Sequence, residues 1–209
     1  MVIAMASLDD RIEGVLLGTA AGDALGAPYE FGPPRGAELE VAMKGGGPWA
    51  PGEWTDDTAM AIAIAQAISK GGDARDQDVQ DTIVARWLEW SRTAKDVGIQ
   101  THRVLSSAAR GGISAERARA EATNVHQQTG RSGGNGSLMR TAPLALAYLD
   151  DEQALVEAAR AISELTHFDP DAGDACVLWT LAIRHAVLTA ELDVRVGLRH
   201  LDAERRPDT

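Results

Sequence analysis

The sequence is short of features that mark several classes of protein. Its 209 residues include one cysteine, Cys176, so no disulfide can form within the chain. That cysteine lies in the apolar run CVLWTLAI, which is typical of a core position, and a lone thiol fits a reducing compartment. No apolar stretch reaches the ~18 residues of a membrane span. Residues 1–11 lack the basic start and long apolar centre of a secretory signal, so we expect a cytoplasmic protein.

Basic residues are also few. The chain has 20 Lys and Arg against 31 Asp and Glu, a formal net charge of −11. A surface this acidic repels phosphates and anionic lipid headgroups, so we expect neither nucleic acid nor a membrane as a partner. The 44% hydrophobic and 24% charged residues are close to the globular average and argue against disorder. The length suggests one domain, which we place at residues 8–204.

Alternating, strand-like patterns are nearly absent, and the apolar periodicity is helical. Helices are predicted over 8–25, 57–70, 76–94, 99–110, 114–127, 137–149, 151–166, 170–190 and 193–204. The stretch AMAIAIA alternates like a strand, but its Ala and Met and the Gln that follows favour helix. The predicted fold class is therefore all-α, a compact multi-helix domain. Five apolar residues are spaced for one buried helix face: Ile83, Val84, Trp87, Leu88 and Trp90.

Glycine is concentrated in two places. In the first predicted helix it recurs every four residues, at Gly14, Gly18, Gly22 and Gly26, which predicts close packing against another helix. Residues 26–56 are rich in both glycine and proline and cannot hold a helix. A loop this long inside one core is typical of a functional lid.

Two acidic segments are candidates for chemistry. Thr55, Asp56 and Asp57 stand directly before a helix, where hydroxyl and carboxylate oxygens suit Mg²⁺ or Ca²⁺. The same residue types cap helices, and considered alone they favour Thr55 or Asp56 as a helix cap. Asp23 lies at the end of the first helix, the unfavourable end for a negative charge, so it is either an exposed acid or contacts a cation or a hydrogen-bonding ligand. Glu30 alone is an ordinary loop carboxylate.

Two later segments could contact a ligand. Residues 130–137, GRSGGNGS, lead into a helix, where backbone N–H groups either cradle an anion such as a diphosphate or form a flexible loop. The spacing is that of neither a P-loop nor a dinucleotide fingerprint. Asp169 and Pro170 are predicted to cap and begin the following helix. His167, just before them, is by default a structural histidine.

Together, and in this order, the segments GDALGAPYEF, WTDDTAMAIA, GGNGSLMRTAPLAL and THFDPDA resemble the ADP-ribosylglycohydrolase family, over about residues 8–204. The resemblance implies an all-α fold with a binuclear Mg²⁺ centre, in which Mn²⁺ is an alternative. Thr55, Asp56 and Asp57 match the family's first metal cluster, and Glu30 matches a glutamate near the metals and the scissile ribose. Two further groups match residues that contact the ligand: Gly134, Asn135, Gly136 and Ser137 at the phosphates, and His167 near the diphosphate or ribose.

The resemblance further implies hydrolysis of the glycosidic bond that joins ribose to a modified protein or a small acceptor. Metal ions would orient the ribose hydroxyls and a water, and Glu30, Asp56 or Asp57 would take the proton. A second acidic cluster, Asp-x-Asp with Thr or Ser, lies late in family members and completes the metal sites. It has no match after Cys176, so we expect the chain to correspond to the N-terminal two-thirds of a longer protein. The alternative function is a non-catalytic ADP-ribose binder.

Overall fold

The computed structural model describes residues 6–33, 36–38 and 40–205. Its α-helices are α1 (Leu8–Gly26), α2 (Asp56–Ile68), α3 (Gln77–Ser91), α4 (Ile99–Ala109), α5 (Ala115–Thr129), α6 (Ala142–Ala147), α7 (Glu152–Glu164) and α8 (Pro170–Thr189). Short 3₁₀ turns are η1 (Ala27–Tyr29), η2 (Leu138–Arg140), η3 (Val194–His200) and η4 (Ala203–Arg205). Within the described residues the only strand-like pairing is one bridge between Gly46 and Trp49. The all-α prediction is confirmed.

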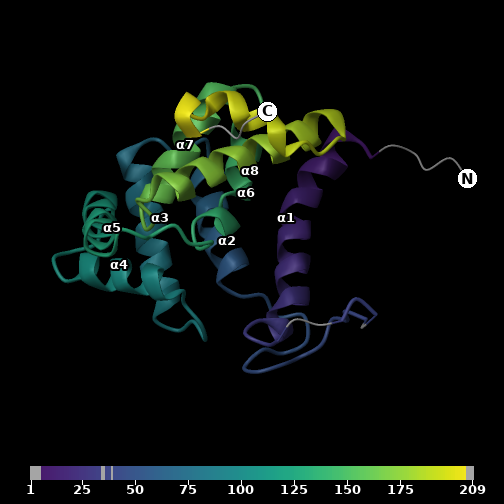
Figure 1. Ribbon diagram of the computed structural model, residues 1–209, viewed down its shortest axis with the longest axis horizontal. Coiled ribbons are helices and arrows are strands. Elements are labelled where there is room, and N and C mark those ends of the chain that lie inside the picture. The colour runs from purple at the N-terminus through teal and green to yellow at the C-terminus, as the bar shows by residue number, and fades with distance from the viewer. Residues whose placement is uncertain (1–5, 34–35, 39, 206–209) are drawn as a thin grey trace, which may run out of the picture.

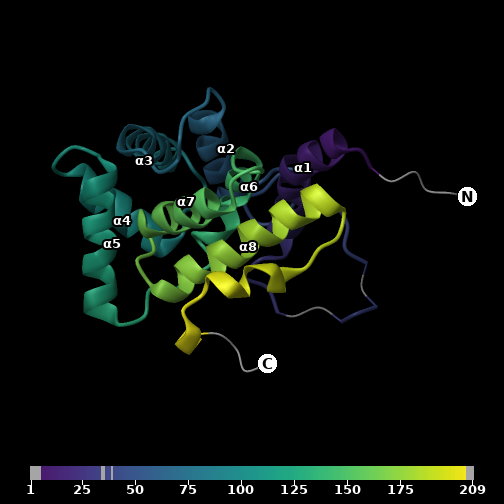
Figure 2. The same cartoon turned by 90° about the horizontal axis from the view of Figure 1, so that it is seen from above.

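Helix α8, the longest helix, runs along the upper side in Figure 1 and packs against α7, α6 and η3. Helix α2 runs antiparallel to α1 and contacts α3 and α6. Helices α4 and α5 lie at one end of the molecule, whereas α1 lies towards the other end, as the view from above shows (Figure 2). The loops that precede α2 and α4 therefore approach each other on one side of the core.

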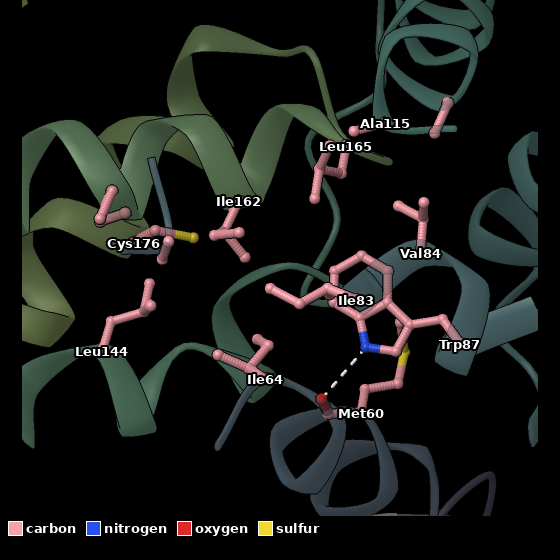
Figure 3. Close-up of a cluster of buried hydrophobic side chains, with 14 of the residues drawn as sticks. Met60, Ile64, Ile83, Val84, Trp87, Ala115, Leu144, Ile162, Leu165 and Cys176 are labelled. Atoms are coloured by element: carbon pink, nitrogen blue, oxygen red, sulfur yellow. Dashed lines mark hydrogen bonds between the residues drawn. The ribbon is translucent and has the colours of Figure 1, made fainter. Parts of the chain in front are cut away.

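The main core is built around Trp87 of α3 (Figure 3). The indole Nε1 of this buried side chain donates to the Met60 carbonyl at 3.1 Å and joins α3 to α2. Ile83, Val84 and Trp87 are fully buried, which confirms the predicted helix face, and Cys176 is buried as predicted. The other two residues of that face are partly buried: Leu88 and Trp90.

Two predicted helices differ from the observed ones. Residues 137–149 form η2 and then α6, because Pro143 lacks an N–H and its ring would clash with the carbonyl of Met139 in a continuous helix. Residues 193–204 form the 3₁₀ turns η3 and η4. Asp193 caps η3 by accepting the N–H of Arg195 at 2.9 Å. The turn packs along α8, where a Cβ at Gly197 would lie 2.9 Å from Leu178.

The glycine stripe of α1 does not pack against another helix of the described chain, so the close-packing prediction is wrong. A Cβ added at Gly14, Gly18, Gly22 or Gly26 would meet no atom within 4 Å. Beside the stripe, Leu17 is 68% exposed. A groove of about 630 Å³ separates α1 from α8; its lining includes Arg11, Gly14, Val15, Trp179, Ile183 and Leu192. In the part of the chain that the structure describes, no helix has both the length and the apolarity to cross a bilayer.

The Gly/Pro-rich segment lies where α1 ends and α2 begins (Figure 1). It is held to η1 at Gly46, where an added Cβ would lie 2.8 Å from Cβ of Pro28. It is also tied to the α3–α4 connection, because Lys95 Nζ donates to Glu53 at 2.6 Å and to the Pro48 carbonyl at 3.0 Å. The segment thus borders the start of α2, and its role as a lid stays a prediction.

Candidate functional site

The start of α2 is capped from another helix. Thr55 is the N-cap residue, but neither its side chain nor that of Asp56 caps α2, contrary to the sequence-based interpretation. Instead Asp23, near the end of α1, accepts the Thr55 N–H at 2.9 Å, the Thr55 hydroxyl at 2.7 Å and the Thr58 N–H at 3.0 Å. These donors explain why a carboxylate is tolerated at the C-terminal end of α1.

Carboxylates crowd around this helix start. Burial raises the pKa of Asp57 to about 6, and the charges of Asp23, Asp56 and Glu30 add to the effect. Burial also raises the pKa of Asp56; the Gly98 N–H opposes that rise. The pKa of Glu30 is raised by burial and then by the charges of Asp56 and Asp23. Burial and mutual repulsion therefore disfavour the charged forms of Asp57, Asp56 and Glu30.

This acidic cluster has the donor chemistry of a magnesium site but not a complete set of ligands. Thr55, Asp56 and Asp57 supply the hard oxygen atoms that Mg²⁺ prefers, and a dication would relieve the repulsion. Among the described residues, no three His, Cys, Asp or Glu side chains are grouped so as to hold an ion. An ion bound by Thr55, Asp56 and Asp57 alone would keep several water ligands.

Asp96 is a member of the site that the sequence analysis missed. Its charge raises the pKa of Asp56 and of Glu30. It lines two clefts beside the acidic cluster, one of about 410 Å³ that also contains Asp56 and Trp90, and one of about 360 Å³ that also contains Glu30. A single Asp in a connection between helices carries no motif of its own, so only the fold identifies it.

The glycine-rich loop begins at Gly130, which ends α5 with a left-handed φ of +62°. Two contacts with other elements fix its path: the Ser132 N–H donates to Asp169 Oδ2 at 3.1 Å, and Gln100 Nε2 donates to the Ser132 carbonyl at 3.0 Å. Asp169 also accepts the N–H of Asp171 and caps α8, as the sequence predicted. The loop is thus tied to the first turns of α4 and α8.

His167 lies against this loop. An added Cβ at Gly136 would lie 2.9 Å from its Cε1, so the ring leaves no room for a side chain there, whereas one at Gly134 would lie in ordinary contact, 3.4 Å from its Nε2. The Ser137 hydroxyl is buried beneath the loop and accepts from Ser163 at 3.0 Å. No part of Ser137 is exposed to solvent, so within this loop the exposed positions are those before it. A cleft of about 250 Å³ is lined by Gly134 and Asn135 and by the first turn of α8.

The first turn of α4 lies between the acidic cluster and the glycine-rich loop. The Gly98 N–H donates to Asp56 Oδ2 at 3.4 Å, and a Cβ at Gly98 would lie 3.8 Å from both that oxygen and Thr101 Oγ1. A Cβ at Gly136 would in turn lie 3.4 Å from Thr101 Oγ1. The two segments singled out in the sequence are therefore neighbours across one helix start.

Comparison with known proteins agrees with this architecture. The family model described as ADP-ribosylglycohydrolase matches residues 4–206. The chain belongs to the ADP-ribosylglycohydrolase family. It is 33% identical over 189 residues to the ADP-ribosylarginine hydrolase Tri1 of Pseudomonas putida (strain GB-1), a match that covers 87% of this chain and 48% of that protein.

A second relative in this family is the ADP-ribosyl-[dinitrogen reductase] glycohydrolase of Rhodospirillum rubrum. It is 33% identical over 192 residues, and the match covers 87% of this chain and 59% of the relative. A solved structure titled "ADP-ribosylglycohydrolase-related protein complex" is 34% identical with a TM-score of 0.65, and the match covers 88% of this chain and 58% of that one. The chain thus spans about half the length of the relatives it matches.

Proposed function

We propose that the chain binds ADP-ribose and, with Mg²⁺, carries out hydrolysis of the bond between ribose and a modified arginine of a protein. One observation carries the proposal: the acidic cluster and the glycine-rich loop flank the same helix start, so that one ligand can reach both. The names of two relatives, which act on ADP-ribosylarginine and on ADP-ribosylated dinitrogen reductase, support an ADP-ribosylated protein as the substrate.

The diphosphate of the ligand would lie on the glycine-rich loop. The backbone N–H groups of Gly134, Asn135 and Gly136 would donate to its oxygen atoms, with the cleft that Gly134 and Asn135 line on one side and the His167 ring against Gly134 and Gly136. The backbone N–H groups in the first turn of α4 are a second set of donors. The N-cap residue of this helix is Gly98, so no side chain caps them. Binding here would direct the ribose towards Asp56 and Glu30.

Thr55, Asp56 and Asp57 would hold the Mg²⁺, with Mn²⁺ as the alternative ion. The bound ion would supply Lewis-acid stabilisation of negative charge that develops on oxygen. Hydrolysis adds a water across the glycosidic bond, so that OH goes to the ribose carbon and a proton to the leaving nitrogen. Glu30, Asp56 or Asp57 would accept the proton that the water gives up. The pKa of each of these carboxyl groups is raised, which makes its carboxylate a better base.

A second candidate function is ADP-ribose binding without catalysis. It is favoured by one observation, that the described residues contain no group of three His, Cys, Asp or Glu side chains placed to hold an ion. The two candidates share the ligand and differ in turnover.

The test uses the full chain and an arginine peptide that carries ADP-ribose. Release of free ADP-ribose is measured with Mg²⁺, with EDTA, and for the double variant Asp56→Asn/Asp57→Asn, with Asp150→Asn as an exposed control. Release that needs Mg²⁺ and both aspartates supports the hydrolase. Saturable ADP-ribose binding without release supports the binder, and the absence of both contradicts the proposal.

Magnesium binding is tested separately by thermal unfolding at constant ionic strength. Because a ligand that binds the folded chain stabilises it, Mg²⁺ in excess should raise the melting temperature by about 2–4 °C, equivalent to roughly 1 kcal/mol. The Asp56→Asn/Asp57→Asn variant should show no such rise, while Asp150→Asn should respond as the unmodified chain does. An equal response in all three would contradict the assignment of these aspartates.

A further inference from the structure

Arg140 is a fully buried cation that no carboxylate pairs with in the described part of the chain. Its guanidinium lies 3.9 Å from the ring centre of Trp87. One nitrogen, Nη2, donates to the Ile162 carbonyl at 3.0 Å and to Thr166 Oγ1 at 2.8 Å, whereas Nε and Nη1 have no partner among the described residues. A buried charge with so few partners is costly, which points to a role besides stability.

The contacts of Arg140 continue to the ligand site through Thr166. Thr166 Oγ1 lies 2.7 Å from Nδ1 of His167. A guanidinium can only donate hydrogen bonds, so the Thr166 oxygen accepts from Arg140. The Thr166 hydroxyl proton is then left for Nδ1, which must accept it. If Nδ1 carried a proton instead, the Thr166 hydroxyl proton would have no acceptor among the described residues.

In a neutral imidazole with an accepting Nδ1, the ring proton lies on Nε2. Burial is the main cause that lowers the pKa of His167 to about 3; the charge of Arg140 lowers it further, and Asp169 opposes the shift. The ring is therefore neutral at neutral pH. Its Nε2 side faces the glycine-rich loop, since the nearest approach to an added Cβ at Gly134 is made by that atom.

We propose that Arg140 and Thr166 are positioning residues that fix His167 in the tautomer protonated at Nε2, so that it offers a neutral N–H donor to an oxygen atom held on residues 134–137. The identity of that oxygen, in the diphosphate of ADP-ribose, rests on the proposed function. The tautomer does not rest on it, because the hydrogen-bond donors and acceptors of the unliganded chain determine it.

A neutral donor has a consequence that an imidazolium would not have. Its hydrogen bond to a phosphate oxygen does not strengthen as the pH falls through 6.5, the ordinary pKa of a histidine. We therefore expect the contribution of His167 to ligand affinity to be the same at pH 5.5 and at pH 8.

The tautomer is measured by ¹⁵N–¹H correlation spectra of the full chain with labelled histidines. The five histidines are few enough to resolve, and His167→Gln identifies the signal of His167. The expected pattern is a protonated Nε2 and an unprotonated Nδ1 that stay unchanged between pH 5 and pH 8. A proton on Nδ1, or a titration near 6.5, would overturn the proposal.

Comparison of Thr166→Val with Thr166→Ser separates the effect of the Thr166 hydroxyl from the effect of the side chain's shape. Serine keeps the hydroxyl and should keep the unmodified pattern. Valine keeps the shape but cannot donate to Nδ1, so its His167 signal should move towards a mixture of tautomers while the other histidine signals stay in place. An unchanged His167 signal in Thr166→Val would count against the proposal. If that variant does not fold, the pattern of the unmodified chain and of Thr166→Ser decides.

Calorimetry with ADP-ribose then tests the link to the ligand. We expect Thr166→Val to bind about tenfold more weakly than Thr166→Ser, equivalent to about 1.4 kcal/mol, and the difference to be equal at pH 5.5 and 8. Equal affinities of the two variants would overturn the donor role. If the unmodified chain binds no ADP-ribose, the proposed function fails, whereas the spectra still decide the tautomer.

Discussion

Within the acidic cluster, burial and repulsion have their largest effect on the pKa of Asp57. Its pKa rises from 3.8 to about 6, because burial disfavours the charge and three neighbouring carboxylates repel it. At pH 7 it is ionised in both the folded and the unfolded chain, and folding places the charge where it is disfavoured. Its folded state gains a proton first as the pH falls, so stability rises between about pH 6 and pH 4.

Replacing Asp57 by Asn should therefore stabilise the metal-free chain at pH 7, by ~1–3 kcal/mol. The same variant should lose the part of the pH dependence that Asp57 contributes between pH 4 and 6. Urea unfolding at pH 7 and pH 5 measures both effects, and the exposed Asp150→Asn serves as a control that should change stability by less than ~0.5 kcal/mol. A less stable Asp57→Asn at pH 7 would mean that the repulsion described above is absent.

Some residues of the site could be predicted from the sequence and others could not. Thr55, Asp56, Asp57 and His167 lie in local patterns, and the structure brings them to neighbouring positions around α4. Asp96 and the capping role of Asp23 depend on contacts across 30 or more residues of chain, for which local sequence has no signal. The position of Arg140 depends in the same way on the packing of η2 against α2 and α8 and on its hydrogen bonds to Ile162 and Thr166.

At the scale of elements, the joint between α1 and α2 is held by one side chain. Asp23 accepts three hydrogen bonds from the first turn of α2, and it also adds to the repulsion on Asp57. Truncation to alanine removes both effects, whereas asparagine removes the charge and keeps one acceptor oxygen. Comparison of the two variants therefore separates the stability contributed by the hydrogen bonds of the cap from the effect of the negative charge.

Asp23→Ala should be less stable than Asp23→Asn by about 1 kcal/mol, the typical contribution of a helix cap. Chemical unfolding of the two variants at pH 7 gives the difference, and near-ultraviolet circular dichroism reports whether the tryptophans keep their packing. Equal stability of the two variants would show that the hydrogen bonds to Thr55 and Thr58 contribute nothing measurable.

The exposed glycines of α1 lead to a second prediction at this scale. Glycine weakens a helix interior, and a Cβ at Gly18 would meet no neighbouring atom. Gly18→Ala should therefore raise the free energy of unfolding by ~0.5–1 kcal/mol. Gly197→Ala is the opposite control, since its Cβ would lie 2.9 Å from Leu178 and should destabilise the chain. Destabilisation by Gly18→Ala would mean that this face of α1 is covered in solution.

The helices themselves were largely predictable, because apolar periodicity and the capping residues Asp151 and Asp169 are local signals. Pro143 is also a local signal, because it divides the predicted helix 137–149 into η2 and α6. The packing of α1 was not predictable. A glycine stripe allows close contact with another helix, but the pattern does not say whether a partner helix lies there. The turn geometry of η3 depends on its contact with α8, which the sequence of that segment does not contain.

At the scale of the whole molecule, an all-helical core brings two loops together around the start of α4. The chain spans about half the length of the relatives it matches. The loops that would contact ADP-ribose are both within the described residues, so binding is a property that this chain can be tested for by itself.

The most direct test of this account is a titration of the isotope-labelled chain with ADP-ribose, with and without Mg²⁺, followed by backbone amide spectra. The account predicts saturable shifts at both sides of α4, at Thr55–Asp57 and at Gly134–Ser137, with Gly98 between them, and Mg²⁺ should strengthen the first set. Shifts confined to one of the two loops, or none at millimolar ADP-ribose, would contradict it.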